Sequence, residues 1–188
     1  MLNIPYKLSS TGAFAKMLQS FGVDLTDWGK NGHKNVSDML TELEEKDSRL
    51  YILDGRLIRY LRVVKMIVRN QDGRFLKEVQ QIRPDGNIKT FNSPRLPSGK
   101  IKRSEAIYTA LLRESQEELG LDAHSLGKWK RMTRWTESKP STFYPTMPTV
   151  QELHFYSINL PPKQQIELRR TEEDGKTIIF DWFAGPPY

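Results

Sequence analysis

Apolar residues recur along the chain with two different spacings, and each spacing predicts a different kind of element. Residues 11–50 have helical periodicity, with a turn at 27–29 that separates the first helix from a second one at 35–46. The apolar positions that define the first helix are Phe14, Met17, Leu18 and Phe21. We therefore expect residues 1–55 to form a helical extension that packs on the rest of the chain or on a partner subunit.

Strand-like segments follow the extension. Residues 57–68 are rich in Val, Ile and Leu, and the turn signal at 70–73 leads directly into 75–79, which predicts a β-hairpin. Further strands are expected around residues 88–91, 129–135, 151–158 and 177–183. A Pro-rich segment at 139–148 is expected to be either a lid or a rigid connector.

One helix is expected among these strands. Ser104 is a plausible N-cap, the helical pattern runs to Leu119, and Gly120 stands where a left-handed residue would end the helix. Strands on both sides of a central helix predict a mixed α+β domain over residues 56–188.

Composition limits the chemistry. With no cysteine, the chain has no disulfide, thiolate metal site or Cys nucleophile, so a metal would be held by oxygen or imidazole. No segment approaches the roughly 20 apolar residues of a membrane span, and no secretory signal stands at the start. We expect an intracellular, cytoplasmic or organellar protein without a membrane partner. A net charge of +6 favours polyanionic ligands such as nucleotides or RNA.

The predicted central helix carries several carboxylates on one side. At about 100° per residue, Glu114, Glu117 and Glu118 fall within one arc of roughly 100°. Like charges at this spacing repel one another, and a hard divalent cation, Mg²⁺ or alternatively Mn²⁺, would remove the repulsion and also bind phosphate oxygens. The alternative is a solvated acidic face.

The spacing from Gly99 to Leu121 distinguishes the two interpretations. Every invariant position of the pattern GX5EX7REUXEEXGU, in which U is a bulky apolar residue, is filled in this segment. The chain thus resembles the Nudix hydrolase family. Ser115 departs from the usual apolar residue, and Ser104 stands where a glycine is frequent.

The resemblance implies a Nudix fold over residues 57–183, an αβα sandwich around a mixed β-sheet. It also implies a metal-dependent pyrophosphohydrolase that cleaves the phosphoanhydride bond of a nucleoside diphosphate linked to another group. By analogy, the metal ligands are Glu114, Glu117 and Glu118, the catalytic residues are Glu105, Arg113 and Glu117, and Gly99 contributes to substrate binding.

Some family members take a general base from a later loop. The candidates in this chain are Glu137 and the pair Glu172 and Glu173, and for each an ordinary surface carboxylate is the alternative. Arg95 or Lys139 could meet phosphate. Four aromatic residues could stack on a base or belong to the core: Trp135, Phe143, Tyr144 and Trp182. The histidines, which lack ligand spacing, are His33, His124 and His154.

Three functional hypotheses remain open from sequence. The first is the small-molecule pyrophosphohydrolase. The second is an RNA cap or RNA 5′-end hydrolase, motivated by the basic charge. The third is a catalytically silent Nudix-fold protein that binds a nucleotide or a partner, against which stands the complete glutamate set. A homodimer formed through residues 1–50 is a further hypothesis.

Overall fold

The structure is a computed structural model that describes residues 2–3, 10–122, 128–162, 166–172 and 175–187. The chain divides into two compact units. Unit 1 comprises Met1–Val63, Lys100–Glu105 and Trp135–Leu153. Unit 2 comprises Val64–Gly99, Ala106–Arg134 and His154–Tyr188.

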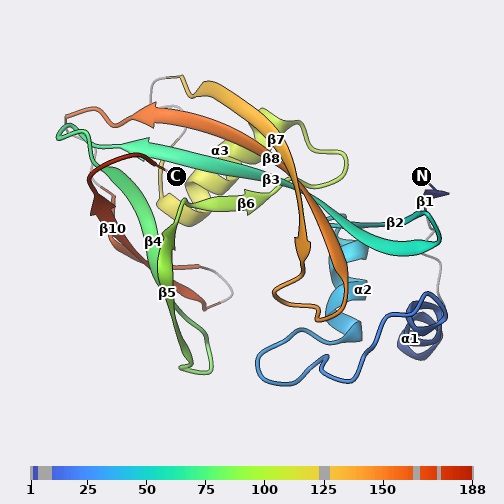
Figure 1. The fold of residues 1–188 in the computed structure, drawn as a ribbon. Coiled ribbons are helices and arrows are strands. Elements are labelled where there is room, and N and C mark those ends of the chain that lie inside the picture. Colours follow the sequence, from blue (N-terminus) through green and yellow to red (C-terminus); the bar gives the residue numbers. More distant parts are fainter. Residues whose placement is uncertain (1, 4–9, 123–127, 163–165, 173–174, 188) are drawn as a thin grey trace. The chain divides into compact units, whose positions relative to one another are not determined.

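The described segments contain three helices and ten strands (Figure 1). The helices are α1 (Thr11–Ser20), α2 (Val36–Glu44) and α3 (Ile107–Leu119). The strands are β1 (Leu2–Asn3), β2 (Arg49–Leu53), β3 (Arg56–Arg69), β4 (Phe75–Ile82), β5 (Ile88–Arg95), β6 (Ser98–Lys100), β7 (Lys130–Pro140), β8 (Pro148–Asn159), β9 (Arg169–Thr171) and β10 (Thr177–Phe183).

The strands pair in a mixed sheet with the order β1-β2-β3-β4-β10-β9, and β5, β6, β7 and β8 join it off this path. Pairs such as β2 with β3 and β4 with β10 are antiparallel. By contrast, β8 runs parallel to β3, because Tyr60 bonds to Glu152 and, further along both strands, the Leu160 N–H donates to Arg69 O. The predicted α+β class with a mixed sheet is confirmed.

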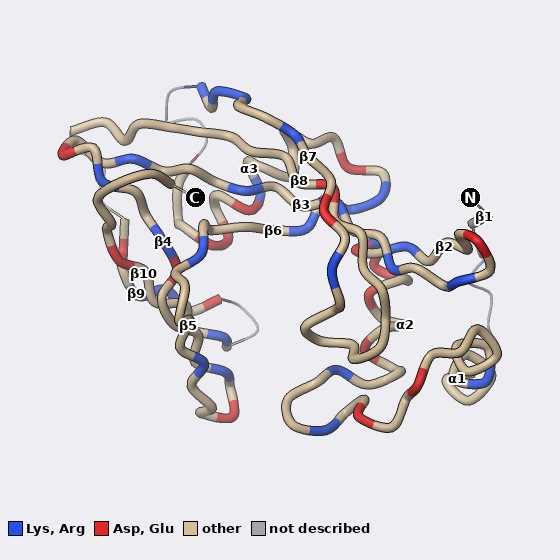
Figure 2. Tube along the Cα trace, viewed as in Figure 1, with Lys and Arg blue, Asp and Glu red and all other residues tan. Residues whose placement is uncertain are grey.

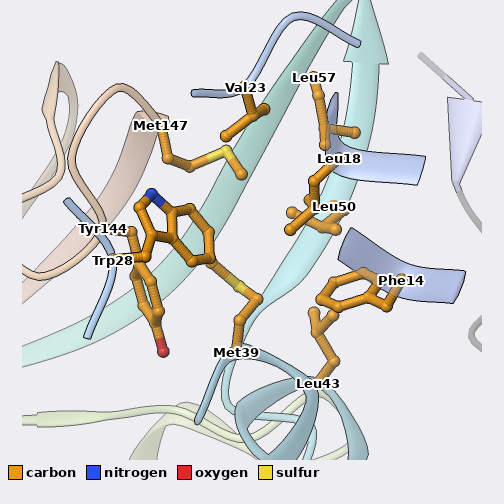
Figure 3. Close-up of a cluster of buried hydrophobic side chains, with 10 residues drawn as sticks. All are labelled: Phe14, Leu18, Val23, Trp28, Met39, Leu43, Leu50, Leu57, Tyr144 and Met147. Carbon is orange, nitrogen blue, oxygen red and sulfur yellow. The ribbon is translucent and has the colours of Figure 1, made fainter. Parts of the chain in front are cut away.

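Unit 1 is organised around an apolar cluster to which both N-terminal helices contribute (Figure 3). Trp28 and Tyr144 have ring centroids 4.9 Å apart, and Trp28 Nε1 donates to Pro145 O at 2.9 Å. The buried members are Phe14, Leu18, Val23, Trp28, Met39, Leu43, Leu50, Leu57, Tyr144 and Met147. The apolar faces of the N-terminal helices are thus covered within the chain, and the Pro-rich segment is a packed connector.

Local capping explains where the N-terminal helices begin. The Ser10 hydroxyl accepts a hydrogen bond from the Ala13 N–H at the start of α1. At the start of α2, Asn35 and Asp38 form a reciprocal capping box. Each pair satisfies backbone N–H groups that a helix leaves free in its first turn.

The predicted N-cap of α3 is wrong. Ser104 lies in a turn that is closed by a hydrogen bond from the Glu105 N–H to Lys102 O, and Ala106 has an extended backbone, so the helix starts only at Ile107. The predicted end is confirmed, because Gly120 has a left-handed backbone with φ of 65°.

Other boundaries differ where strand pairing decides them. Residues 49 and 50, expected to be helical, belong to β2, which pairs with β3. Strands β7 and β8 extend into the Pro-rich segment and leave only residues 141–147 as a loop. The hairpin turn at 70–73 is confirmed by the antiparallel pairing of β3 with β4. None of the helices described is long and apolar enough to cross a membrane.

Candidate active site

Helix α3 packs against β6 through an unusually close approach. Glu114 is buried, and its carboxyl group lies directly over Gly99, where an added Cβ would fall 1.7 Å from Glu114 Cδ. Only glycine leaves room for this side chain. Gly99 is the first residue of the segment 99–121, which we call the Nudix box. Its identity is therefore explained, within unit 2, by the space that a buried carboxylate occupies.

Arg113 links two of the helix carboxylates (Figure 2 marks the charged residues of α3). Its Nη1 donates to Glu114 Oε1 at 2.7 Å and to Glu117 Oε2 at 2.9 Å. The Glu117 side chain is 55% exposed, whereas that of Glu114 is 10% exposed. Arg113 therefore holds one buried and one exposed carboxylate by charge-assisted hydrogen bonds.

Glu118 lies among other carboxylates. Its Oε2 accepts a hydrogen bond from the Ser98 N–H at 3.0 Å. Burial is the main cause that raises its pKa well above the usual value, followed by the negative charges of Glu114 and Glu172, and more weakly by that of Glu78. Lys176 opposes the shift without cancelling it. Several carboxylates therefore lie close to Glu118.

Glu78 on β4 belongs to this region and was not identified from sequence. Glu78 is 6% exposed, and its Oε2 accepts a hydrogen bond from Arg95 Nη2 at 2.7 Å. Its other oxygen, Oε1, is buried and has no hydrogen-bond partner among the described residues. The pairing register of β4 shifts beside it on both neighbouring strands, as at a β-bulge, which can redirect a side chain. The sequence did contain a signal, because Glu78 stands two residues after the apolar Leu76 and so shares its face of the strand.

Arg170 on β9 brings a second strand to the end of α3. Its Nε donates to Glu117 O at 2.8 Å and its Nη2 to Gln116 O at 2.9 Å. These carbonyls lie in the last turn of α3, where a cation is favourable to the helix dipole. Glu172 follows two residues later, which accounts for its electrostatic effect on Glu118.

The fold and the geometry of this site can be compared with known proteins. Residues 59–184 match the sequence profile of the NUDIX domain. The chain belongs to the Nudix family. Nudix proteins are typically pyrophosphohydrolases that act on nucleotide-type substrates with a divalent cation, and the predicted family membership is confirmed. No curated protein matches the chain.

Several solved structures are similar to this Nudix chain. The MutT protein of Bacillus halodurans is 16% identical over 65% of this chain and 67% of its own, with a TM-score of 0.41. The C. elegans Ap4A hydrolase is 15% identical, with 65% and 79% covered and a TM-score of 0.40. The E. coli dihydroneopterin triphosphate pyrophosphohydrolase is 20% identical, with 64% and 78% covered and a TM-score of 0.44.

The predicted site residues of the Nudix box do not all lie in one unit. Unit 2 contains Gly99, Arg113, Glu114, Glu117 and Glu118, together with Glu78, Arg95 and Glu172. Unit 1 contains Glu105, whose Oε2 accepts from the Lys102 N–H at 3.1 Å, and Glu137, which pairs with Lys139 at 2.5 Å. Glu173 lies outside the described residues.

Substrate contacts expected from aromatic residues need one correction. Base stacking is wrong for Tyr144, which is fully buried in the core of unit 1, whereas Trp135 and Phe143 remain exposed and Trp182 is partly buried. Of the histidines, His154 is buried, the His33 ring contacts Asp27 O, and His124 lies outside the described residues.

The side chains of the unit 2 site are of the chemical type that binds a divalent cation. Among the described residues, no three His, Asp or Glu side chains are already arranged so that together they could hold a metal ion. However, the raised pKa of Glu118 and the partnerless buried oxygen of Glu78 both favour a positively charged occupant. Carboxylate oxygen is also the ligand that Mg²⁺ prefers.

Proposed function

We propose that this Nudix protein is a Mg²⁺-dependent pyrophosphohydrolase that cleaves the phosphoanhydride bond of a nucleoside diphosphate linked to another group. The observation that carries the proposal is the concentration of carboxylates around Glu118, to which α3, β4 and the segment after β9 contribute. Carboxylates that lie this close together repel one another and destabilise the fold when no cation is bound. The arrangement becomes favourable when a cation and its phosphate ligands bind.

The candidate ligands for the cation are Glu114, Glu117 and Glu118. Glu78, whose charge also affects Glu118, has a buried oxygen without a hydrogen-bond partner among the described residues. When bound, Mg²⁺ would bind the diphosphate oxygens and offset their charge. The chain's own contribution is to orient the carboxylates. Arg113 holds Glu114 and Glu117, and the Ser98 N–H holds one oxygen of Glu118.

Two further residues have roles in this proposal. Arg95 is partly exposed beyond its pair with Glu78, so its guanidinium can also contact a phosphate. Glu172 is the favoured late base, because it is near enough to Glu118 to affect its pKa. A water molecule attacks one phosphorus, the bond from that phosphorus to the bridging oxygen breaks, and the water proton passes to Glu172. The products are two phosphate monoesters.

The test is turnover of a substrate panel with Mg²⁺ or Mn²⁺. The panel contains nucleoside diphosphates linked to sugars, nucleotides and cofactor fragments, and product release is measured for the wild type, Glu117→Gln and Glu44→Gln. Glu44 is an exposed glutamate of α2 and serves as a matched control. We expect metal-dependent turnover that falls by about 10²- to 10³-fold in Glu117→Gln only.

One observation favours RNA ends as a second candidate substrate. Within unit 2, β7 exposes Lys130, Arg131 and Arg134. Blue segments mark basic residues along β7 in Figure 2. Lys130 also lines a pocket together with Arg69. Basic side chains along an exposed strand suit a phosphate backbone. Capped and 5′-triphosphate RNA therefore belong in the panel, and turnover of RNA should weaken steeply with salt.

The alternative that would refute the proposed activity is a catalytically silent Nudix-fold protein. It would follow if a folded wild type bound nucleotide, by calorimetry, but released no product from any member of the panel with either metal.

A further inference from the structure

The Nudix loop, which we define as Lys100–Glu105, is bound by the N-terminal part of unit 1. Lys100 Nζ lies 3.1 Å from Glu42 Oε1 and 3.2 Å from Asp47 Oδ2. Glu42 is on α2, and Asp47 follows that helix before β2 begins. The first residue of the loop is thus ion-paired with two carboxylates of the N-terminal segment.

Backbone hydrogen bonds hold the same loop at a second point. The Arg103 N–H donates to Lys46 O at 2.9 Å, and Arg49 Nη2 donates to Arg103 O at 3.2 Å. Lys46 and Arg49 flank the connection from α2 to β2. Both polar backbone groups of Arg103 are therefore satisfied by the N-terminal segment.

The anchor for these contacts is buried. Glu42 is 5% exposed, and its other oxygen accepts from Arg59 on β3 at 2.5 Å. Ile101, next to Lys100, is also buried, and its N–H donates to Arg62 O at 2.9 Å. Since Glu42 and Ile101 are both buried, the start of the loop has little freedom to move relative to unit 1.

The loop carries one glutamate of the Nudix box. Glu105 closes a turn with Lys102 in which the Lys102 N–H donates to Glu105 Oε2 at 3.1 Å and the Glu105 N–H donates to Lys102 O at 3.0 Å. Lys100 and Arg103, which lie on either side of Lys102, are the residues that the N-terminal segment contacts. The orientation of Glu105 in the turn therefore depends on these contacts.

We infer that the segment from α2 to β2 positions the Nudix loop for catalysis, with Lys100 and Glu42 as positioning residues. The inference rests on the proposed hydrolase function, because Glu105 matters only if the box performs chemistry. It assigns a role to the N-terminal extension, which the Nudix box itself does not include.

The test compares Lys100→Met with Lys34→Met. Lys34 Nζ pairs with the same oxygen, Glu42 Oε1, at 2.7 Å, but it lies outside the loop. Both substitutions remove one cation from Glu42, and only the first releases the loop. Each full-length variant is assayed for kcat and KM on the substrate turned over by the wild type, and for amide hydrogen exchange of residues 101–105.

We expect kcat of Lys100→Met to fall roughly tenfold with KM nearly unchanged, since a misplaced group affects the reacting geometry more than binding. Amides of Ile101 and Arg103 should exchange roughly tenfold faster, as expected for loss of a charged hydrogen bond. Lys34→Met should match the wild type in both measurements. Lys100→Arg, which keeps the charge, should restore most of kcat.

The inference is overturned if Lys100→Met retains wild-type kcat and exchange, or if Lys34→Met shows the same losses, because the effect would then belong to Glu42 and not to the loop. If the wild type turns over no substrate, the hydrolase proposal has failed. Amide exchange then tests only whether Lys100 holds the loop, and equal exchange in Lys100→Met and Lys34→Met would show that it does not.

Discussion

Each unit contains a largely buried glutamate within a charged group, and the two groups differ in sign. In unit 1, Glu42 contacts three cations: Arg59, Lys34 and Lys100. In unit 2, Glu118 is surrounded mainly by carboxylates. Burial raises the pKa of Glu42, but these cations together outweigh it and lower the pKa to about 2, whereas the pKa of Glu118 is raised. The first group stabilises the fold, whereas under the proposed function the second binds a cation.

The largest expected effect comes from neutralising the centre of the unit 2 group. Glu118→Gln should reduce hydrolysis by about 10²- to 10³-fold, because it removes a proposed metal ligand. The same change should leave the thermal unfolding temperature equal or higher, since it removes repulsion from Glu114 and Glu172. Activity and calorimetry on one preparation test both parts. A variant that loses activity and also melts earlier would contradict the comparison.

The corresponding change in unit 1 should affect stability. Glu42→Gln leaves Arg59 buried without its carboxylate, and we expect a loss of about 3 to 5 kcal/mol in the free energy of unfolding. Urea unfolding at pH 7 measures it, with the exposed Glu44→Gln as control. A loss below that of the control would mean that the Glu42 group is not structural.

The contribution of Glu42 should depend on pH in a definite direction. Its pKa is lowered in the folded state to about 2 from the usual 4.5, so the folded state favours the charged form. The stabilisation, about 3 kcal/mol from this difference, is fully present above pH 4.5 and is lost as pH falls towards 2. The stability gap between wild type and Glu42→Gln should therefore narrow over this range in urea titrations. A gap that stays constant would refute the assignment.

A smaller effect should come from Glu78. If its partnerless oxygen faces the cation, Glu78→Gln should weaken Mn²⁺ binding by roughly tenfold, a loss typical of residues that support a metal site. Titration of free Mn²⁺ by electron paramagnetic resonance measures this without reference to turnover. Unchanged affinity, with Glu118→Gln still defective, would place Glu78 outside the metal site and limit its role to the pair with Arg95.

Sequence patterns predicted the local features of the fold well. The hairpin turn at 70–73, the end of α3 at Gly120 and the family depend on residues close together in the chain. The start of α3 at Ser104 was wrong, because a turn and an extended Ala106 intervene. Strands β2 and β9 were missed, although each pairs with the next strand in the chain. For β2 a local signal existed, because Asp54 and Gly55 form the two-residue turn to β3 with left-handed backbones.

By itself, the sequence determined which carboxylates share a helix face, because helical periodicity is a property of neighbouring residues. Only the tertiary structure decided what surrounds each one. Glu78 reaches the acidic region from a bulged strand, and Glu172 reaches it because Arg170 ties β9 to the end of α3. The charge state and chemistry of a glutamate depend on burial and on charges brought from distant segments, and no local pattern encodes these.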